Sequence, residues 1–564
     1  MRRLSCLLLA ILLSAPLAAT AQIRLEGVDL SDEADDATKE KAAGGLGLDL
    51  REEGGAEMAA GVKARVTAAT RLFDEGNYEA AALGFWEILQ DPKAAQAHPR
   101  AEYMLGKSLY RMGMYHSALA IFKRILERGP TNRFFATSLE WLFFIAHKTT
   151  NHTVVLDELA RYAGVPFPER YKEEYSYLLA KYNFIRARAL KEAQEADQTT
   201  TAYLEASEAS LNEARRLVAL VPPSSPFYPR AKYLDALALY ASGNPTLAVE
   251  SFKEVVRSTN PRREDAVYDP KLRELAFMQL ARIHYEHRQN RHANFYYGRI
   301  VRGSDQWLQA LFESAWAYFR IGEDEKALGN LITLRSPFFR DEYFPEAMLL
   351  EAVIYYGNCR YPEAQRAVEA FLERYSPLHR ELARLLQRDL PSPKAYWDAI
   401  AARPEGERDE MLERILRMAL SDQELRQLSD SIEELEGEVQ SISQRRELFR
   451  FSGLAKHLLA ELRAQREELA KKAGHHAKRK LEKELRELAN LNYRALAIKA
   501  EIASREKETL QAALEKGESV TVVKRYRYST AVDDEHVYWP YEGEFWRDEL
   551  GSYEYTLTRG CKER

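Results

Sequence analysis

The chain has little of what catalysis, metal binding or membrane insertion usually requires. Its 564 residues include only three cysteines, and it has no HExxH, Gly-rich phosphate loop, GxSxG or paired CxxC pattern. No apolar run reaches the ~20 residues that span a bilayer. A formal net charge of −5 is small for this length and gives no general attraction to nucleic acid. We therefore expect no enzyme, metal, cofactor, transmembrane span or nucleic-acid partner.

The first residues have the pattern of a secretory signal peptide. Arg2 and Arg3 precede an apolar stretch over residues 4–17, and Ala19-Thr20-Ala21 supplies small residues for cleavage before Gln22. We expect residues 1–21 to be removed and the mature protein to be periplasmic. An export compartment would permit Cys359 and Cys561 to pair, but the expectation is one buried thiol and one free thiol in the tail.

Residues 22–60 are acidic and glycine-rich with few bulky apolar groups. Such a segment buries too little surface to offset its ordering entropy. We predict a disordered acidic linker.

Residues 61–380 contain a repeat anchored on alanines. The six anchors are Ala81, Ala118, Ala248, Ala293, Ala327 and Ala364. The residue twelve positions before each anchor is small, namely Ala69, Gly106, Ala236, Ala281, Ala315 and Ala352. The residue four positions after each is bulky, namely Phe85, Phe122, Phe252, Tyr297, Leu331 and Val368. Small residues facing each other with large neighbours indicate two short helices that cross closely.

Glycines and prolines at the expected helix ends fit this interpretation. Glycine stands five positions before four anchors, where the chain turns between helices, at Gly76, Gly113, Gly243 and Gly322. Prolines that we expect to end the second helices follow at Pro92, Pro130, Pro261, Pro337 and Pro377. One helix pair cannot bury its apolar face alone, so successive pairs must stack.

The pattern resembles the tetratricopeptide repeat, most clearly in Leu105-Gly106, Leu109, Gly113, Tyr115, Ala118, Phe122 and Pro130. The 37 residues from Ala81 to Ala118 lie near that family's ~34-residue unit. The resemblance implies an all-α solenoid. Residues 131–227 lack the small-residue pattern, but stretches 134–147, 171–192 and 199–220 have helical periodicity and indicate degenerate repeats.

The resemblance also implies a protein-binding groove lined by the first helix of each pair. Its register places these residues on the lining: Tyr103, Lys107, Tyr110, Arg111, Tyr233, Tyr240, Arg282, Tyr285, Phe312, Trp316, Phe319, Arg320 and Tyr356. Tyrosine, tryptophan and arginine dominate many interface energies, so we expect a peptide segment to bind there. The alternative for each residue is packing against the next repeat.

After a connector at 381–407, residues 408–516 change character. A heptad seam runs through Leu425, Leu428, Ile432, Leu435, Val439 and Ile442, and a second apolar run follows from Leu481. Either Phe451-Ser452-Gly453 or Lys471–His476 could interrupt the helix. We expect a coiled-coil hairpin, because a lone rod would leave its seam exposed, and it could also mediate self-association.

The tail, residues 517–564, is rich in aromatics and alternates as short strands do. We predict a small β-containing unit whose docking residues are Trp539, Tyr541, Phe545 and Trp546. The tail could fold back on the helices or add to the sheet edge of a partner.

The remaining polar clusters are weak candidates for chemistry. His284, His287 and His292 are the nearest approach to a metal site, but His284 occupies a core position of the repeat. His475 and His476 lie among lysines and could form a solvated turn or helix face, or a docking patch for an acidic partner or anionic lipid headgroups. Acidic tail residues would have to carry a cell-wall-acting enzyme, namely Glu542, Glu544, Asp548 and Glu549.

Together these features predict an adaptor that binds envelope proteins or peptide segments and holds a cell-envelope complex together. The order of signal peptide, linker, repeats, coiled segment and aromatic tail is similar to exported repeat proteins of myxobacteria, which implies gliding motility or envelope assembly. The alternatives are a cell-wall-acting enzyme and a holdase-like chaperone, which would capture unfolded chains without selectivity.

Overall fold

The computed structural model describes most of the chain after the predicted linker. It covers residues 60–149, 153–165, 171–196, 201–264, 266–340, 342–388, 390, 392–401, 410–420, 422–516, 528–530, 540–541, 543–555 and 557. The predicted signal peptide and nearly all of the acidic linker lie outside this set.

Helix pairs form the first two thirds of the described chain. The first helices of the pairs are α3 (Ala60–Asp74), α5 (His98–Arg111), α7 (Phe135–Ala146), α9 (Lys172–Ala196), α11 (Tyr228–Ala241), α13 (Pro270–Glu286), α15 (Trp307–Arg320) and α17 (Pro345–Gly357). The second helices are α4 (Tyr78–Gln90), α6 (Tyr115–Glu127), α8 (Thr153–Arg161), α10 (Ala202–Val218), α12 (Pro245–Ser258), α14 (Asn290–Tyr297), α16 (Asp324–Leu334) and α18 (Tyr361–Gln387). The short 3-10 turns η1 (Pro92–Ala97) and η3 (Pro337–Phe339) each join one pair to the next. The helical solenoid is confirmed, and the degenerate stretch resolves into α7 to α10.

The anchor alanines lie where the helices cross. All six have no exposed surface, and a Cβ on Gly106 would lie only 2.9 Å from the Phe122 ring. The turn before each anchor needs a left-handed residue: φ is +80° at Gly76 and +76° at Gly322. Arg288 and Cys359 stand at the same position in the other two repeats and adopt φ of 60° and 54°. The backbone geometry is therefore kept where the glycine is not.

Two expectations about this region are wrong. Pro377 does not end a helix, because α18 continues through it to Gln387. Tyr375, Leu378 and Leu382 carry the buried apolar face across the proline, so packing compensates the lost backbone hydrogen bond. Cys359 is disulfide-bonded rather than a free buried thiol, and its partner cysteine lies outside the described residues.

The C-terminal helices follow the array. They are α19 (Pro393–Ala401) within the predicted connector, α20 (Glu410–Leu420), α21 (Gln423–Gln444), the short α22 (Glu447–Arg450) and α23 (Gly453–Lys516). The hairpin turns between α21 and α23 around Phe451-Ser452, whereas Lys471–His476 is helical throughout. At 64 residues and ~1.5 Å per residue, α23 is roughly 95 Å long.

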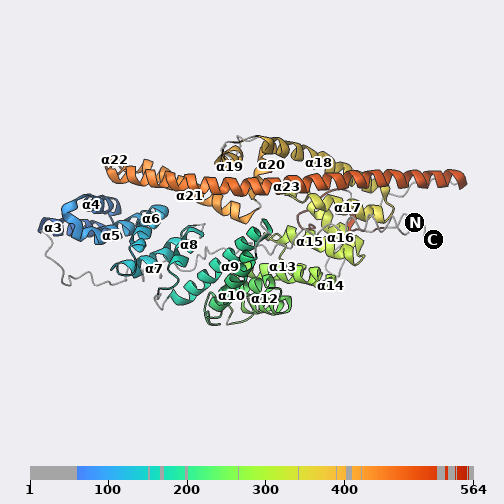
Figure 1. Cartoon of the computed structure of the whole chain (residues 1–564). Coiled ribbons are helices and arrows are strands. Elements are labelled where there is room, and N and C mark those ends of the chain that lie inside the picture. Colours follow the sequence, from blue (N-terminus) through green and yellow to red (C-terminus); the bar gives the residue numbers. More distant parts are fainter. Residues whose placement is uncertain are drawn as a thin grey trace.

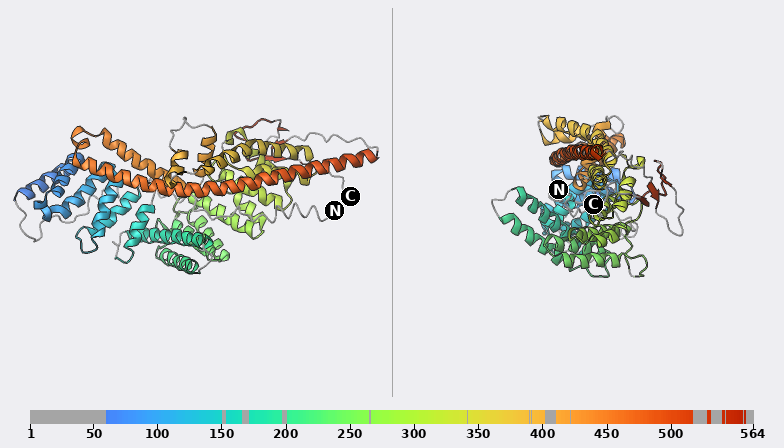
Figure 2. Two further views of the ribbon diagram at one scale, coloured as in Figure 1. Left: turned by 45° about the horizontal axis from the view of Figure 1, so that its top comes forward. Right: turned by 90° about the vertical axis from the view of Figure 1, so that its right-hand side faces the viewer.

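The long helix α23 runs along most of the molecule (Figure 1). The repeats form an arc beside it: α3 to α6 lie at one end, α9 to α12 bow away in the middle, and α17 lies towards the other end. Helices α18, α19 and α20 lie on the other side of α23, and the second view shows the same arrangement (Figure 2). The C-terminal helices thus span the arc from its first repeats to its last.

A small antiparallel sheet closes the described chain, with β1 (Tyr528–Thr530) between β2 (Pro540–Tyr541) and β3 (Tyr553–Tyr555). Tyr528 is opposite Tyr541 on one side and Tyr555 on the other. Strand β3 lies directly on α16, where a Cβ on Gly329 would come within 1.8 Å of the Tyr553 carbonyl oxygen. None of the described helices is both long and apolar enough to cross a membrane.

Candidate protein-binding site

Part of the predicted groove lining is buried between neighbouring repeats. Tyr103 stacks on Phe134 with ring centroids 4.7 Å apart and accepts a hydrogen bond from Trp141 Nε1 at 3.0 Å. The buried members of the predicted lining are Tyr103, Tyr110, Tyr233, Arg282 and Phe312. These five side chains therefore stabilise the packing of neighbouring repeats.

Lys107 lies in an aromatic setting. Its Nζ is 5.1 Å from the centre of the Phe73 ring and 5.8 Å from that of Tyr103. Burial lowers the pKa of this ammonium group. The neighbouring lining residue, Arg111, is partly exposed.

A buried ion pair joins α13 to α15. Arg282 contacts both carboxylate oxygens of Glu313, with Nη2 at 2.8 Å from Oε1, and the Tyr297 hydroxyl donates to Oε2 at 2.9 Å. Burial acts to raise the pKa of Glu313, but attraction and hydrogen bonds from Arg282 outweigh it, so the pKa is lowered. Arg282 thus fixes the spacing of two groove helices.

Four side chains beside this pair stay partly accessible, and we call Tyr285, Trp316, Phe319 and Arg320 the groove cluster. The Arg320 guanidinium lies 3.9 Å from the Tyr285 ring centre, and its Nη1 donates to the Tyr285 carbonyl oxygen at 3.2 Å. Trp316 and Phe319 meet edge to face at 6.0 Å. The cluster offers aromatic area next to a fixed positive charge.

The Tyr285 hydroxyl is buried and makes no hydrogen bond within the described residues. Burial raises the pKa of this phenol to about 12, so it keeps its proton near neutral pH. An unpaired buried hydroxyl costs about 1–3 kcal/mol, so this group is a local energetic cost within the cluster. Tyr240, one repeat earlier, has its hydroxyl bonded to Glu286.

At the last repeat the lining position is used by the chain itself. The Tyr356 hydroxyl donates to Glu501 Oε1 of α23 at 2.9 Å. Burial raises its pKa to about 12. Helix α23 therefore occupies in cis a position predicted for a partner.

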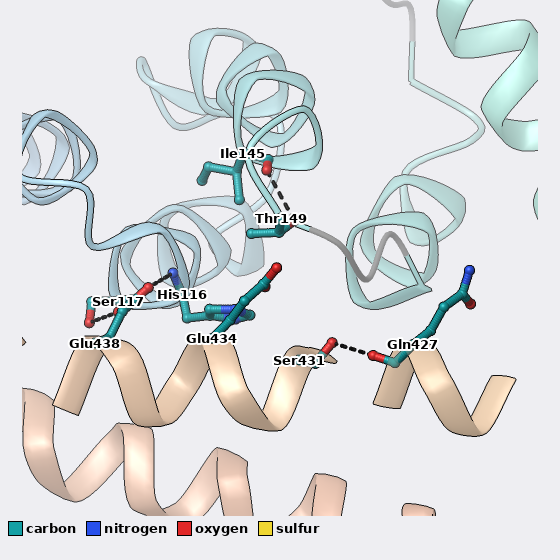
Figure 3. Close-up of polar contacts among 8 residues, drawn as sticks. All are labelled: His116, Ser117, Ile145, Thr149, Gln427, Ser431, Glu434 and Glu438. Atoms are coloured by element: carbon teal, nitrogen blue, oxygen red, sulfur yellow. Dashed lines mark hydrogen bonds and ion pairs between the residues drawn. The ribbon is translucent and has the colours of Figure 1, made fainter. Parts of the chain in front are cut away.

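The other end of the array is held by a carboxylate from α21. Glu438 accepts hydrogen bonds from the His116 amide at 2.6 Å, the Ser117 amide at 3.2 Å and the Ser117 hydroxyl at 2.9 Å (Figure 3). Helix α6 starts after Met114, whose side chain cannot cap it. Glu438, more than 300 residues away in sequence, supplies the missing cap and complements the helix dipole.

Arg445, at the C-terminal end of α21, contacts the C-terminal end of the adjacent helix α5 with a positive charge. Its Nη2 donates at 2.8 Å to the carbonyl oxygen of Met112, which ends α5. The negative group therefore meets a helix N-terminus and the positive group a C-terminus. His116 adds a contact of 2.9 Å to Glu434. We call this set of contacts the near joint.

The far joint connects α23 to the last repeat and to α19. The Tyr343 hydroxyl donates to Glu484 at 3.1 Å, and the Ser376 hydroxyl donates to Asn492 at 2.9 Å. A Cβ on Gly474 would lie 1.8 Å from the carbonyl oxygen of Pro393, so α19 rests on the bare backbone of α23. Buried Ala470, Ala473 and Ala477 continue this small stripe.

Neither joint was found by sequence reasoning. The stripe of Ala470, Ala473, Gly474 and Ala477 carries the same small-residue signal as the repeats and could have revealed the far joint. For the near joint the only sequence signal is the absence of a capping residue before α6.

The described part of the tail packs on α16. The Gly551 amide donates to the Thr333 hydroxyl at 2.9 Å, and the Leu557 amide donates to Glu325 at 2.7 Å. Phe545 is half-buried and meets Tyr553 edge to face at 6.2 Å, whereas Trp546 is 59% exposed. Trp539 lies outside the described residues, as does the side chain of Tyr541. The tail thus folds back on its own array.

The histidine and tail carboxylate candidates make contacts within the described chain. His284 stacks on His292 and Tyr296, each at 5.4 Å, and burial lowers its pKa. No group of three or more metal-ligating side chains occurs among the residues that the structure describes. Burial raises the pKa of Glu549, and its carboxylate accepts a hydrogen bond from the Tyr553 hydroxyl at 3.4 Å. Glu542 lies outside the described set.

Comparison with known proteins adds a family to this geometry. Residues 100–131, which contain α6 and all but the first two residues of α5, match the tetratricopeptide repeat model. No curated protein matches the chain.

Solved structures with some similarity include a tetratricopeptide repeat protein from Parabacteroides merdae. It is 11% identical, covers 56% of this chain and 94% of its own length, and has a TM-score of 0.21. Yeast Tom70 is 11% identical over 82% of this chain and 99% of its own, also with a TM-score of 0.21. Scores this low carry no argument about arrangement or function. The family match shows a tetratricopeptide repeat at residues 100–131, and the other helix pairs of the array have the same helix–turn–helix architecture.

Proposed function

We propose that this protein is a periplasmic scaffold that holds parts of a cell-envelope multiprotein complex together, serving gliding motility or envelope assembly. The observation that carries the proposal is the groove cluster. In it, the partly exposed Arg320 guanidinium is held on the Tyr285 ring, and the Trp316 and Phe319 rings are also partly exposed. These groups suit an extended segment of a partner protein that offers a backbone carbonyl or a carboxylate.

The frame formed by α23 supports this proposal. The near joint holds the second repeat and the far joint holds the last, so the curvature of the array is set before a partner arrives. A groove held in its binding shape loses less conformational entropy on association.

Two features support the proposed location. The first 21 residues have the charge, apolar length and small-residue pattern of a secretory signal. The disulfide at Cys359 is a bond that persists in oxidising compartments and is rare in the cytosol. N-terminal sequencing of the protein from a periplasmic fraction should begin at Gln22, and an unprocessed cytosolic chain would contradict the location.

A crosslinking pull-down from the envelope tests the groove. The variants are Tyr285→Ala and Trp316→Ala, and Tyr268→Ala is the matched control because Tyr268 is 67% exposed outside the cluster. We expect both groove variants to lose the same few partners that the parent and the control retain. Recovery of those partners by all variants would show that the groove cluster does not bind them.

The alternatives give different results in the same preparation. Turnover of peptidoglycan that is lost in Glu544→Gln would point to a cell-wall enzyme. Capture of many unfolded chains without saturation would point to a holdase.

A further inference from the structure

The distal part of α23 has two apolar faces, and only one of them is packed against other described residues. Leu491, Ala495, Ile498 and Ile502 are buried against the rest of the molecule. On a second face, Tyr493 is 71% exposed, Leu496 56%, Leu510 42% and Leu514 79%. Exposed Ala500, Ala503 and Lys507 complete this face, which we call the outer seam.

The outer seam has the spacing of a coiled coil. Its members at 493, 496, 500, 503, 507, 510 and 514 alternate steps of three and four residues. The end of α23 also projects beyond α17 in both figures (Figure 1, Figure 2). A long apolar stripe on a projecting helix is typical of an interaction face.

We propose that the outer seam binds the outer seam of a second copy of this chain in antiparallel orientation. An antiparallel pairing about a two-fold axis next to Arg505 places side chains of complementary size opposite each other. Leu496 meets Leu514 of the partner subunit, and Ala500 meets Leu510 of the partner subunit. Ala503 lies opposite Lys507 of the partner subunit, whose ammonium can reach solvent along its alkyl stem.

Charge at the edges of the seam favours the same orientation. In this register Lys499 flanks Glu506 of the partner subunit, and symmetry repeats the pair. Lys499 Nζ also lies 3.2 Å from Glu369 of its own chain, but with 43% exposure and three donors it can serve both carboxylates.

The parallel arrangement lacks these advantages. It would place Lys507 against Lys507 of the partner subunit, and it would align Ala500 and Ala503 with their own copies, leaving gaps in the seam. Like charges and voids both disfavour that arrangement. The outer seam therefore selects an antiparallel second copy rather than a parallel one.

The dimer is expected to be concentration-dependent, because the seam covers only about three heptads. Sedimentation of the mature chain over a range of concentrations measures it. Leu496→Asp with Leu514→Asp should weaken dimerisation by at least about tenfold, since each places a charge in the seam. Leu448→Asp is the control, because Leu448 is 76% exposed at the hairpin turn and off the seam. A parent chain that stays monomeric, or a dimer indifferent to the seam variants, would overturn the proposal.

Orientation is tested with Leu496→Cys and Leu514→Cys made as separate full-length variants and mixed under mild oxidation. The antiparallel register predicts a disulfide between the two variants that exceeds the background of the parent chain. Disulfides formed only between identical variants would indicate parallel pairing and overturn the proposal. Crosslinking at the background level would do so as well.

Discussion

The repeat array and the C-terminal helices solve the same packing problem in different ways. In the array, close crossing is achieved six times with the same small residues, so each contact is one of many. The C-terminal helices use one stripe of small residues around Gly474, and they add single buried polar contacts such as Glu438. Redundant apolar packing gives the array its stability, whereas unique contacts determine where the long helix lies. Single substitutions should therefore cost more at the joints than at the turns of the array.

The largest expected effect is at the far joint. Gly474→Ala places a Cβ against the Pro393 carbonyl oxygen and should lower the free energy of unfolding of the C-terminal helices by about 3 kcal/mol. Gly437→Ala is the matched control, because a Cβ there meets nothing within 4 Å, and it should stabilise α21 by up to about 1 kcal/mol. Urea unfolding followed by circular dichroism compares them. Equal midpoints for the two variants would mean that α19 does not rest on α23.

The next effect is at the near joint. Glu438→Ala removes the acceptor for the His116 and Ser117 amides and should cost about 2 kcal/mol in the docking of the hairpin. Limited proteolysis of the α21–α22 turn reports the loss. Glu436→Ala is the control, because Glu436 is exposed on the same helix and forms a surface ion pair with Arg466. Similar cleavage rates for the two variants would contradict the role of Glu438.

A smaller effect is expected at the turns of the array. Arg288 is exposed and held at φ 60°, so Arg288→Gly should raise the free energy of unfolding by about 1 kcal/mol. Gly322→Ala, at the equivalent turn with φ +76°, should lower it by about the same amount. Thermal unfolding of both variants measures the pair. Changes of the same sign would show that the two turns are not equivalent.

The smallest effect is a pH dependence with opposite signs at two buried carboxylates. The pKa of Glu313 is lowered, so its contribution to stability is present above the ordinary carboxyl range and is lost as pH falls through its folded pKa. Burial raises the pKa of Glu438, so its contribution is fully present below the ordinary range and decreases as pH rises through its folded pKa.

Unfolding of Glu313→Gln and Glu438→Gln from about pH 7 to about pH 4 tests this difference. Relative to the parent, Glu313→Gln should become less destabilising on acidification. Glu438→Gln should become more so. Parallel pH profiles for the two variants would contradict the assignment.

Much of the fold could be predicted from the sequence because its signals are local. The spacing around Ala118 identifies a helix pair, and the heptad residues from Leu425 to Ile442 identify α21. The left-handed turns at Arg288 and Cys359 were not predicted, because these residue types rarely adopt positive φ and so give no sequence signal. Glycine adopts it readily and does give one. The predicted helix end at Pro377 was wrong because the packing of α18 against α23 outweighs the local effect of a helix-breaking residue.

The site was harder to predict than the fold. Carrying over the register of the repeat placed Tyr285, Trp316 and Arg320 on the predicted lining, but it could not show that Tyr103 and Tyr233 are buried between neighbours. Nor could it show that Glu501 reaches Tyr356, since long-range partners leave no periodic signal. The exposed outer seam has periodicity, but burial decides which of two faces stays free.

Hydrogen exchange at the start of α6 tests the central claim, that the C-terminal helices are docked along the array, most directly. Amides in the first turn of a helix have no partner within that helix, so protection of His116 and Ser117 requires an outside acceptor. We predict slow exchange of both amides in the full chain and fast exchange in Glu438→Ala, with Ala80, capped locally by Asn77, unchanged in both. Fast exchange of His116 and Ser117 in the parent chain would contradict the docking of α21 on the array.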